Sequence, residues 1–204
     1  RLKTASCADR IPGIYLEGPF INPDKRGAVP EKYIRPIDLA FLKQLQHLAG
    51  GRIRMMTFAP ELKGAGSLPA AMRQMAILPC VGHSLASATT TAAVCGRYRV
   101  CCAHLFNAMS GLDHRQPGVA AFGLNCDRAY VELNPDGTHV APDLLQLTRR
   151  AKPEDRIVLI SDAMVFAGAE YGVYEYLDMK FKSSQEGVYN LQTGTLTGSN
   201  ILLN

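Results

Sequence analysis

The sequence predicts an α/β fold built around a parallel β-sheet. Short apolar segments alternate along the chain with segments of helical length. The apolar segments run continuously rather than alternating with polar residues, which is typical of parallel strands buried on both faces. With 204 residues, 47% of them hydrophobic, the chain is long enough to bury a substantial core. An open doubly wound sheet and a barrel both fit this pattern.

Six apolar segments are the expected strands. They are residues 14–20, residues 53–58, the stretch just before Gly82, residues 99–105, residues 129–133 and residues 157–161. Glu17-Gly18-Pro19 lies at the end of the first segment and Ala59-Pro60 ends the second, because glycine and proline interrupt regular structure. Helical stretches fill most of the gaps between them, as they do in parallel sheets.

The expected helices are residues 36–49, 68–77, 86–95 and 142–151. The first has Pro36 in its first turn, apolar residues at helical spacing and a stop at Gly50-Gly51. The glycine- and proline-containing segment that runs to Leu124 is expected to be a loop. Residues 179–196 alternate polar and apolar side chains around Gly187, which predicts a β-hairpin insertion.

Composition argues against several classes of protein. No run of about 18 apolar residues is present, so no transmembrane helix is expected. The net charge of +4 comes from scattered basic residues, which disfavours nucleic-acid binding and suits a small anionic substrate. Nucleotide-binding glycine fingerprints are absent. The six cysteines form no C-x-x-C pair, so we expect buried, reduced thiols in a cytoplasmic protein.

Ligand-type side chains follow five of the expected strands. They are Glu17, His83, His104, the run from Asp136 to His139, and Asp162. In parallel α/β folds the carboxyl ends of the strands hold ligands and catalytic groups. We therefore expect these side chains to converge, although they are far apart in the sequence.

The chemistry of this set is specific. The imidazoles of His83 and His104, together with the Glu17 carboxylate, suit Zn²⁺ or a similar divalent ion and leave a position open for water. Such an ion lowers the pKa of water towards about 7. Asp162 can then take the proton and later deliver it to a leaving group, although it can also cap the following segment. The sequence thus predicts metal-assisted hydrolysis.

The loop after His104 offers groups for an anion. Asn107 and Ala108 supply an amide side chain and backbone N–H groups. Arg115 follows in the same loop and suits forked contacts to phosphate, with an ordinary surface position as the alternative.

Six short motifs occur in a fixed order along the chain. They are Leu16-Glu17-Gly18-Pro19-Phe20-Ile21-Asn22-Pro23, Gly82-His83-Ser84, His104-Leu105-Phe106-Asn107-Ala108-Met109, Asp136-Gly137-Thr138-His139, Ser161-Asp162-Ala163 and Gly194-Thr195-Leu196-Thr197-Gly198-Ser199. With these motifs the chain, from about Gly13 to its end, resembles the N-acetylglucosamine-6-phosphate deacetylases of the amidohydrolase superfamily. The first and third motifs are highly specific when they occur together.

The resemblance implies a TIM-like (β/α)8 metal-dependent hydrolase that removes the acetyl group from N-acetylglucosamine 6-phosphate in amino-sugar catabolism. Glu17, His83 and His104 would hold one divalent metal ion, Zn²⁺ or Fe²⁺, and Asp162 would be the general base and acid. The implied substrate contacts are Asn107, Ala108 and Arg115 at the phosphate, His139 at the sugar, and Leu196, Thr197 and Gly198 closing over it. Members of the family are usually homodimers.

The sequence departs from the family in two ways. Residues 27–30 read Gly-Ala-Val-Pro, and the family usually has a substrate-contacting histidine where Val29 stands. Upstream segments are also missing, so we expect residues 1–204 to form an incomplete barrel domain without its first strands and most of a companion β-sandwich. Two alternatives stay open: a truncated paralogue that binds metal and sugar phosphate but turns over poorly, and another amidohydrolase that acts on a cyclic amide.

Overall fold

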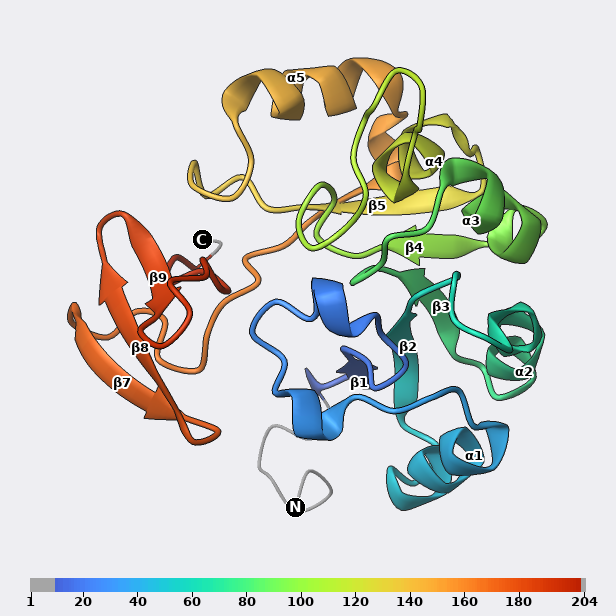
Figure 1. Cartoon of the computed structure of the whole chain (residues 1–204), viewed down its shortest axis with the longest axis horizontal. Helices are drawn as coiled ribbons and strands as arrows, with labels where there is room; N and C mark the ends of the chain where they lie inside the picture. Colours follow the sequence, from blue (N-terminus) through green and yellow to red (C-terminus); the bar gives the residue numbers. More distant parts are fainter. Residues whose placement is uncertain (1–9, 203–204) are drawn as a thin grey trace.

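The structure is a computed structural model that describes residues 10–202. Six parallel strands form one curled sheet in chain order, β1-β2-β3-β4-β5-β6. They are β1 (Ile14–Leu16), β2 (Ile53–Phe58), β3 (Leu78–Val81), β4 (Val100–Cys102), β5 (Ala129–Leu133) and β6 (Ile157–Leu159). A doubly wound sheet would reverse its strand order part-way, so this order excludes that alternative. The sheet curves round the middle of the molecule as half of a barrel (Figure 1).

Within residues 10–202, five α-helices and four short 3₁₀-helices connect the strands. They are η3 (Pro23–Lys25), η4 (Glu31–Tyr33), α1 (Leu39–Leu48), η5 (Ala65–Ser67), α2 (Leu68–Gln74), α3 (Ala88–Cys95), α4 (Val119–Asn125), α5 (Pro142–Ala151) and η6 (Glu154–Arg156). In Figure 1 the α-helices lie on the outer side of the curled sheet.

The main hydrophobic core lies between these helices and the outer face of the sheet. Leu42 of α1, Met72 of α2 and Phe122 of α4 share one buried cluster with Met56 and other strand residues. The inner face has only a small apolar cluster made by strand residues. The two faces of the sheet are covered in different ways, because helices pack on the outer face and the curled strands turn their inner face towards one another.

Helix α1 begins later than the sequence pattern predicts. Asp38 caps the helix, since its carboxylate accepts hydrogen bonds from the N–H groups of Ala40 at 2.8 Å and Phe41 at 3.1 Å. Such a cap satisfies backbone donors that have no partner within the helix. Pro36 consequently lies before the helix rather than in its first turn.

Helix α4 was expected to be a loop. Its glycines are packing residues: a Cβ atom at Gly123 would lie only 3.0 Å from the Cys102 sulfur and 3.2 Å from the Leu105 side chain. Glycine therefore allows α4 to approach the sheet closely. The glycines of this segment are also the reason that its sequence pattern predicts a loop.

Strands β1, β4 and β6 end earlier than expected, and the first two of these ends carry metal-ligand candidates. The chain leaves β1 at Leu16 and β4 at Cys102, and it then enters the left-handed region at Gly18, with φ 87°, and at His104, with φ 27°. Since the backbone turns out of the sheet at these points, Glu17 and His104 extend from the strand ends rather than lying within the ladder.

A separate antiparallel sheet follows β6. It contains β7 (Gly172–Tyr176), β8 (Met179–Ser184) and β9 (Gly187–Asn190) in the order β7-β8-β9. Strands β8 and β9 lie in the segment expected to form a hairpin, whereas β7 was not expected. Phe166, Phe181 and Val188 form its own small core.

The cysteines that the structure describes are free: Cys80, Cys95, Cys101 and Cys102 are buried, and Cys126 is partly buried. Cys7 lies outside the described residues. None of the helices within residues 10–202 has the length and apolar character that a bilayer-crossing helix requires.

Candidate active site

Three ligand-type side chains meet at the carboxyl ends of β1, β3 and β4. His83 Nε2 lies 2.8 Å from Glu17 Oε1 and 3.1 Å from His104 Nε2, and His104 Nε2 lies 3.1 Å from Glu17 Oε1. Both histidines are buried, whereas the Glu17 side chain is half exposed. The structure thus brings the three expected metal ligands to one point.

The hydrogen bonds behind the histidines determine which nitrogen faces this point. His83 Nδ1 lies 2.7 Å from the carbonyl oxygen of Lys25, and His104 Nδ1 lies 3.2 Å from that of Asn107. A carbonyl oxygen only accepts, so each Nδ1 carries the hydrogen and each neutral ring presents an Nε2 lone pair.

Two imidazole lone pairs and a carboxylate oxygen therefore converge, which is unfavourable unless a cation or an added proton lies between them. Metal-bound histidines almost always donate their other N–H to a carbonyl, a carboxylate or water. The donor set and the contacts behind it fit a divalent metal ion held by Glu17, His83 and His104.

The charges of this cluster favour positive charge at its centre. Burial alone would raise the pKa of Glu17, but hydrogen bonds from His104 and His83 lower it well below its usual range. Burial alone would lower the pKa of His104, but the Glu17 carboxylate raises it to about 9. A proton on His104, or a metal ion in its place, is therefore stabilised here.

Asp162 follows β6 and lines the same cavity as the three ligands. It keeps contact with solvent, yet the surrounding protein partly desolvates the carboxyl and raises its pKa, while the charge of His104 acts in the opposite direction. A carboxylate beside a candidate metal site is suited to accept and return a proton.

Residues 196–199 are tied to Asp162 along one side of the cavity. The N–H of Ser199 donates to the Asp162 carbonyl oxygen at 2.7 Å, and the N–H of Thr197 donates to Val188 of β9 at 2.9 Å. A Cβ atom at Gly198 would lie 2.5 Å from the same Asp162 oxygen, so only glycine allows this approach. The small sheet and Asp162 therefore form one connected unit.

His139 is engaged on both sides of its ring. Its Nδ1 lies 2.6 Å from Asp136 Oδ2, and its Nε2 makes a short contact to the carbonyl oxygen of Thr197. Both neighbours are oxygen acceptors, so each ring nitrogen of His139 faces a group that can receive a hydrogen bond. His139 thus joins the loop after β5 to residues 196–199, and a contact to sugar would have to exchange with the Thr197 contact.

The cavity above the cluster has a volume of about 760 Å³. Its lining includes all but one of the site residues expected from the sequence: Glu17, His83, His104, Asn107, Ala108, His139, Asp162, Leu196, Thr197 and Gly198. Arg115 is the exception, because it lies in the exposed loop 111–117 outside the lining. Residues 23–30, with Val29 among them, and parts of the small sheet complete the wall.

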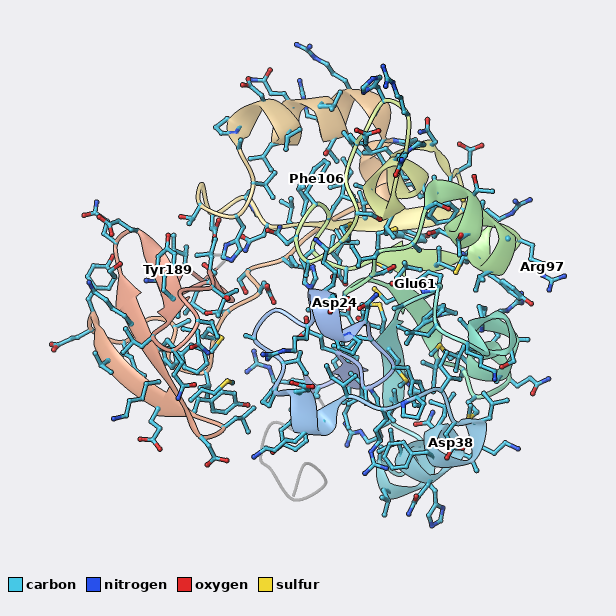
Figure 2. The ribbon with its side chains drawn as sticks, viewed as in Figure 1. Asp24, Asp38, Glu61, Arg97, Phe106 and Tyr189 are labelled. Atoms are coloured by element: carbon cyan, nitrogen blue, oxygen red, sulfur yellow. The ribbon has the colours of Figure 1, made fainter. Side chains whose placement is uncertain are left out.

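Glu61 holds together the loops that carry Glu17 and His83, a role that the sequence analysis missed. Its carboxylate accepts hydrogen bonds from the Asn22 side chain at 2.9 Å, the Ser84 hydroxyl at 2.7 Å and the Leu85 N–H at 2.6 Å. Figure 2 labels Glu61 and also Asp24 of η3, which stands two residues after Asn22.

A buried polar layer lies on the inner face of the sheet below the cluster. Tyr15 Oη lies 2.9 Å from Thr57 Oγ1, 3.0 Å from Cys80 Sγ and 3.4 Å from Glu132 Oε2. Cys101 Sγ lies 3.7 Å from Glu132 Oε1. The sequence signal for this layer was a charged residue, Glu132, within the otherwise apolar strand 129–133.

No family model matches the chain. Among curated proteins, it is 37% identical to the N-acetylglucosamine-6-phosphate deacetylase of Bacillus subtilis (strain 168), over 94% of this chain and 48% of that protein. It is 35% identical to the N-acetylgalactosamine-6-phosphate deacetylase of Escherichia coli O157:H7, over 94% of this chain and 50% of that protein.

Solved structures agree with these relatives. A mutant N-acetyl-D-glucosamine-6-phosphate deacetylase from Mycobacterium smegmatis, in complex with N-acetyl-D-glucosamine-6-phosphate, superposes with a TM-score of 0.89 and 31% identity. The match covers 93% of this chain and 50% of that structure. The chain spans about half the length of the curated relatives it matches. The resemblance that the motifs indicate is thus confirmed over almost the whole chain.

Proposed function

We propose that this chain carries the active site of a metal-dependent deacetylase that hydrolyses N-acetylglucosamine 6-phosphate to glucosamine 6-phosphate and acetate. One observation carries the proposal: Glu17, His83 and His104 meet beside Asp162 in one cavity, in a chain 37% identical to a named deacetylase. The sequential order of β1–β6 and their curl support a TIM-like (β/α)8 barrel, of which residues 1–204 are an incomplete domain with an insertion at about 179–196.

In this proposal Asp162 is the general base and then the general acid. It removes a proton from the attacking water and later delivers it to the amide nitrogen as the C–N bond breaks, so that water and amide become acetate and amine. Glu17, His83 and His104 hold the metal ion, which when bound supplies Lewis-acid polarisation and lowers the pKa of water towards about 7. Zn²⁺ and Fe²⁺ both suit this ligand set.

The remaining site residues bind and enclose the substrate. Asn107 and Ala108 offer an amide and backbone N–H groups for the phosphate, and Arg115 adds a guanidinium in a homodimer whose subunit contact brings this loop to the site. His139 contacts the sugar, and Leu196, Thr197 and Gly198 close over it. The five free cysteines among the described residues support a reducing compartment such as the cytoplasm.

A second candidate substrate is the galactosamine epimer. The chain is 35% identical to the relative named N-acetylgalactosamine-6-phosphate deacetylase and 37% identical to the relative named N-acetylglucosamine-6-phosphate deacetylase, so the two identities are close. The two sugars share the acetamide and the phosphate, so the same residues would serve both.

The proposal is tested by measuring acetate released from each of the two sugar phosphates by the chain loaded with Zn²⁺ or Fe²⁺. We expect release from at least one of them and none from the unphosphorylated sugars. A cyclic amide serves as the third substrate, and preference for it would favour another amidohydrolase activity.

The rate of acetate release also tests the effect of Val29, which stands where the family usually has a histidine. Loss of one polarising donor costs on the order of 10²-fold in rate, so a slow enzyme that Val29→His accelerates would still support the proposal. Metal and sugar-phosphate binding without acetate release, in the parent chain and in Val29→His, would instead identify a binding protein.

A further inference from the structure

Glu132 is a buried carboxyl group that is neither a metal ligand nor the base. It lies on β5, is 3% exposed and faces the inside of the curled sheet. Within residues 10–202 it forms no ion pair with a basic side chain. A carboxyl buried without such a partner is unfavourable, so its position calls for another explanation.

Glu132 binds two successive backbone amides at the end of β4. Its side-chain Oε2 accepts the N–H of His104 at 3.2 Å, and its backbone carbonyl accepts the N–H of Leu105 at 2.7 Å. The chain has left the β4 ladder here, since β4 ends at Cys102. The His104 amide therefore has a side-chain acceptor in place of a neighbouring strand.

This contact is made where the backbone is strained. His104 has φ 27°, a conformation that residues other than glycine rarely adopt and that persists only when the surroundings hold it. The same residue must direct its Nε2 to within 3.1 Å of both Glu17 Oε1 and His83 Nε2. Rotation of the residue about its own backbone would move this nitrogen away from the other two ligands.

The Glu132 carboxyl is itself held from other strands. Tyr15 Oη of β1 lies 3.4 Å from its Oε2, and Cys101 Sγ of β4 lies 3.7 Å from its Oε1. These groups touch the carboxyl but form no hydrogen bond with His104. The long contact from Tyr15 reaches the oxygen that receives the His104 amide, and the contact from Cys101 reaches the other oxygen.

We propose that Glu132 is a positioning residue for the metal centre: its carboxyl oxygen holds the backbone amide of His104 and thereby directs His104 Nε2 at the metal position. The inference rests on the proposed metal site. It predicts that metal affinity depends on an acceptor at this exact place rather than on polarity in the barrel interior.

The experiment measures the dissociation constant for Zn²⁺, by competition with a chelator, and the visible spectrum of the Co²⁺-loaded chain. Glu132→Leu removes the acceptor at similar size and should raise the dissociation constant about 10–100-fold, the usual effect of losing a partner behind a ligand. Glu132→Gln keeps an acceptor oxygen and should retain most of the affinity and the parent Co²⁺ spectrum. Glu132→Asp shortens the side chain by one methylene group and moves the acceptor oxygen away from the His104 N–H, so the affinity for Zn²⁺ should fall. This variant tests the inference if Glu132→Leu does not fold.

Cys101→Ala is the matched control, because it removes the contact to the other carboxyl oxygen and leaves the one that faces His104. Its dissociation constant should stay at the parent value. Parent-like affinity in both Glu132→Leu and Glu132→Asp would overturn the inference, as would equal weakening in Cys101→Ala. If the parent chain binds no Zn²⁺, the metal site itself is wrong, and that result is distinct from the first two.

Discussion

Two clusters of ligand-type side chains lie on the inner face of the same sheet, one above the other. The upper cluster is Glu17, His83 and His104, and the lower cluster is Cys80, Cys101 and Glu132. In each, the candidate ligand atoms lie within 4.8 Å of one another. The two clusters differ in whether hydrogen-bond donors lie among the candidate ligand atoms, and this difference indicates which cluster binds a metal.

In the lower cluster, hydrogen-bond donors surround the carboxyl group that accepts from them. The Tyr15 hydroxyl, the Cys101 thiol and the His104 N–H all point at Glu132, which is the acceptor. Burial raises the pKa of Cys80 well above its ordinary value, and burial likewise raises the pKa of Glu132. A metal ion would have to displace these protons, whereas in the upper cluster the three facing atoms are acceptors that share at most a proton on His104. Proximity of ligand atoms is therefore a weaker criterion than the absence of donors among them.

The largest expected effect is the loss of metal from the upper cluster. His104→Asn or His83→Asn removes one of three ligands, so bound metal should fall close to zero and acetate release should disappear. Metal content measured by elemental analysis checks this. His47→Asn, on the exposed side of α1, should keep both, and retention of metal in both ligand variants would mean that the ion binds elsewhere.

Asp162→Asn should separate chemistry from binding. The amide cannot take the proton, so turnover should fall by about 10²–10⁴-fold while metal content stays at the parent level. Steady-state rates and metal content are measured on the same samples. Loss of metal in this variant would show that Asp162 belongs to the upper cluster as a ligand.

Tyr15→Phe should act on stability alone. Its hydroxyl contacts Thr57, Cys80 and Glu132, so its removal should lower the free energy of unfolding by about 1 kcal/mol. Denaturant titration gives this value, and metal content should not change. A drop in metal content would mean that the two clusters are coupled more tightly than their hydrogen bonds indicate.

The smallest expected effect is on metal binding when the lower thiols are replaced. Cys80→Ser combined with Cys101→Ser should leave metal content unchanged, and Cd²⁺ added to the parent chain should give no thiolate charge-transfer absorption. Cys102→Ser, which alters the helix-covered face, is the matched control. A thiolate band that only the double variant removes would show that the lower cluster binds soft metals after all.

The upper cluster was predictable because its signal is local. Each ligand lies at or just after the end of a short apolar run, and strand ends in a parallel sheet must meet at one edge. The strands at 53–58 and 129–133 and the helix at 142–151 have the bounds that the sequence predicts. Mostly apolar runs in the two strands and a proline in the first turn of the helix indicate these elements without help from the tertiary structure.

The rest depends on contacts that sequence spacing does not encode. Helix α4 contains Gly123 because of the Cys102 sulfur beside it, and strand β7 exists because β8 lies next to it. Glu132 and Glu61 act through backbone amides of distant loops, so no motif marks them. The phosphate contacts given to Asn107 and Arg115 come from the chemistry of their loop and the sugar contact given to His139 comes from the resemblance, and both remain predictions.

Asp162 and the three ligands are attached to parts of the sheet with different local stability. Phe20 and Ile21, which follow Glu17, are fully buried, whereas Val158 and Leu159 of β6 are 41% and 59% exposed. Within the described residues β1 also lies at an edge of the sheet, next to β2 alone, but the buried Phe20 and Ile21 continue it, whereas β6 is exposed and pairs only with β5. Such a strand opens at a lower free energy than the core, and its amides should exchange with solvent deuterium first. Deuterium exchange can therefore follow the strand that carries Asp162 separately from the more deeply buried segments that carry Glu17, His83 and His104.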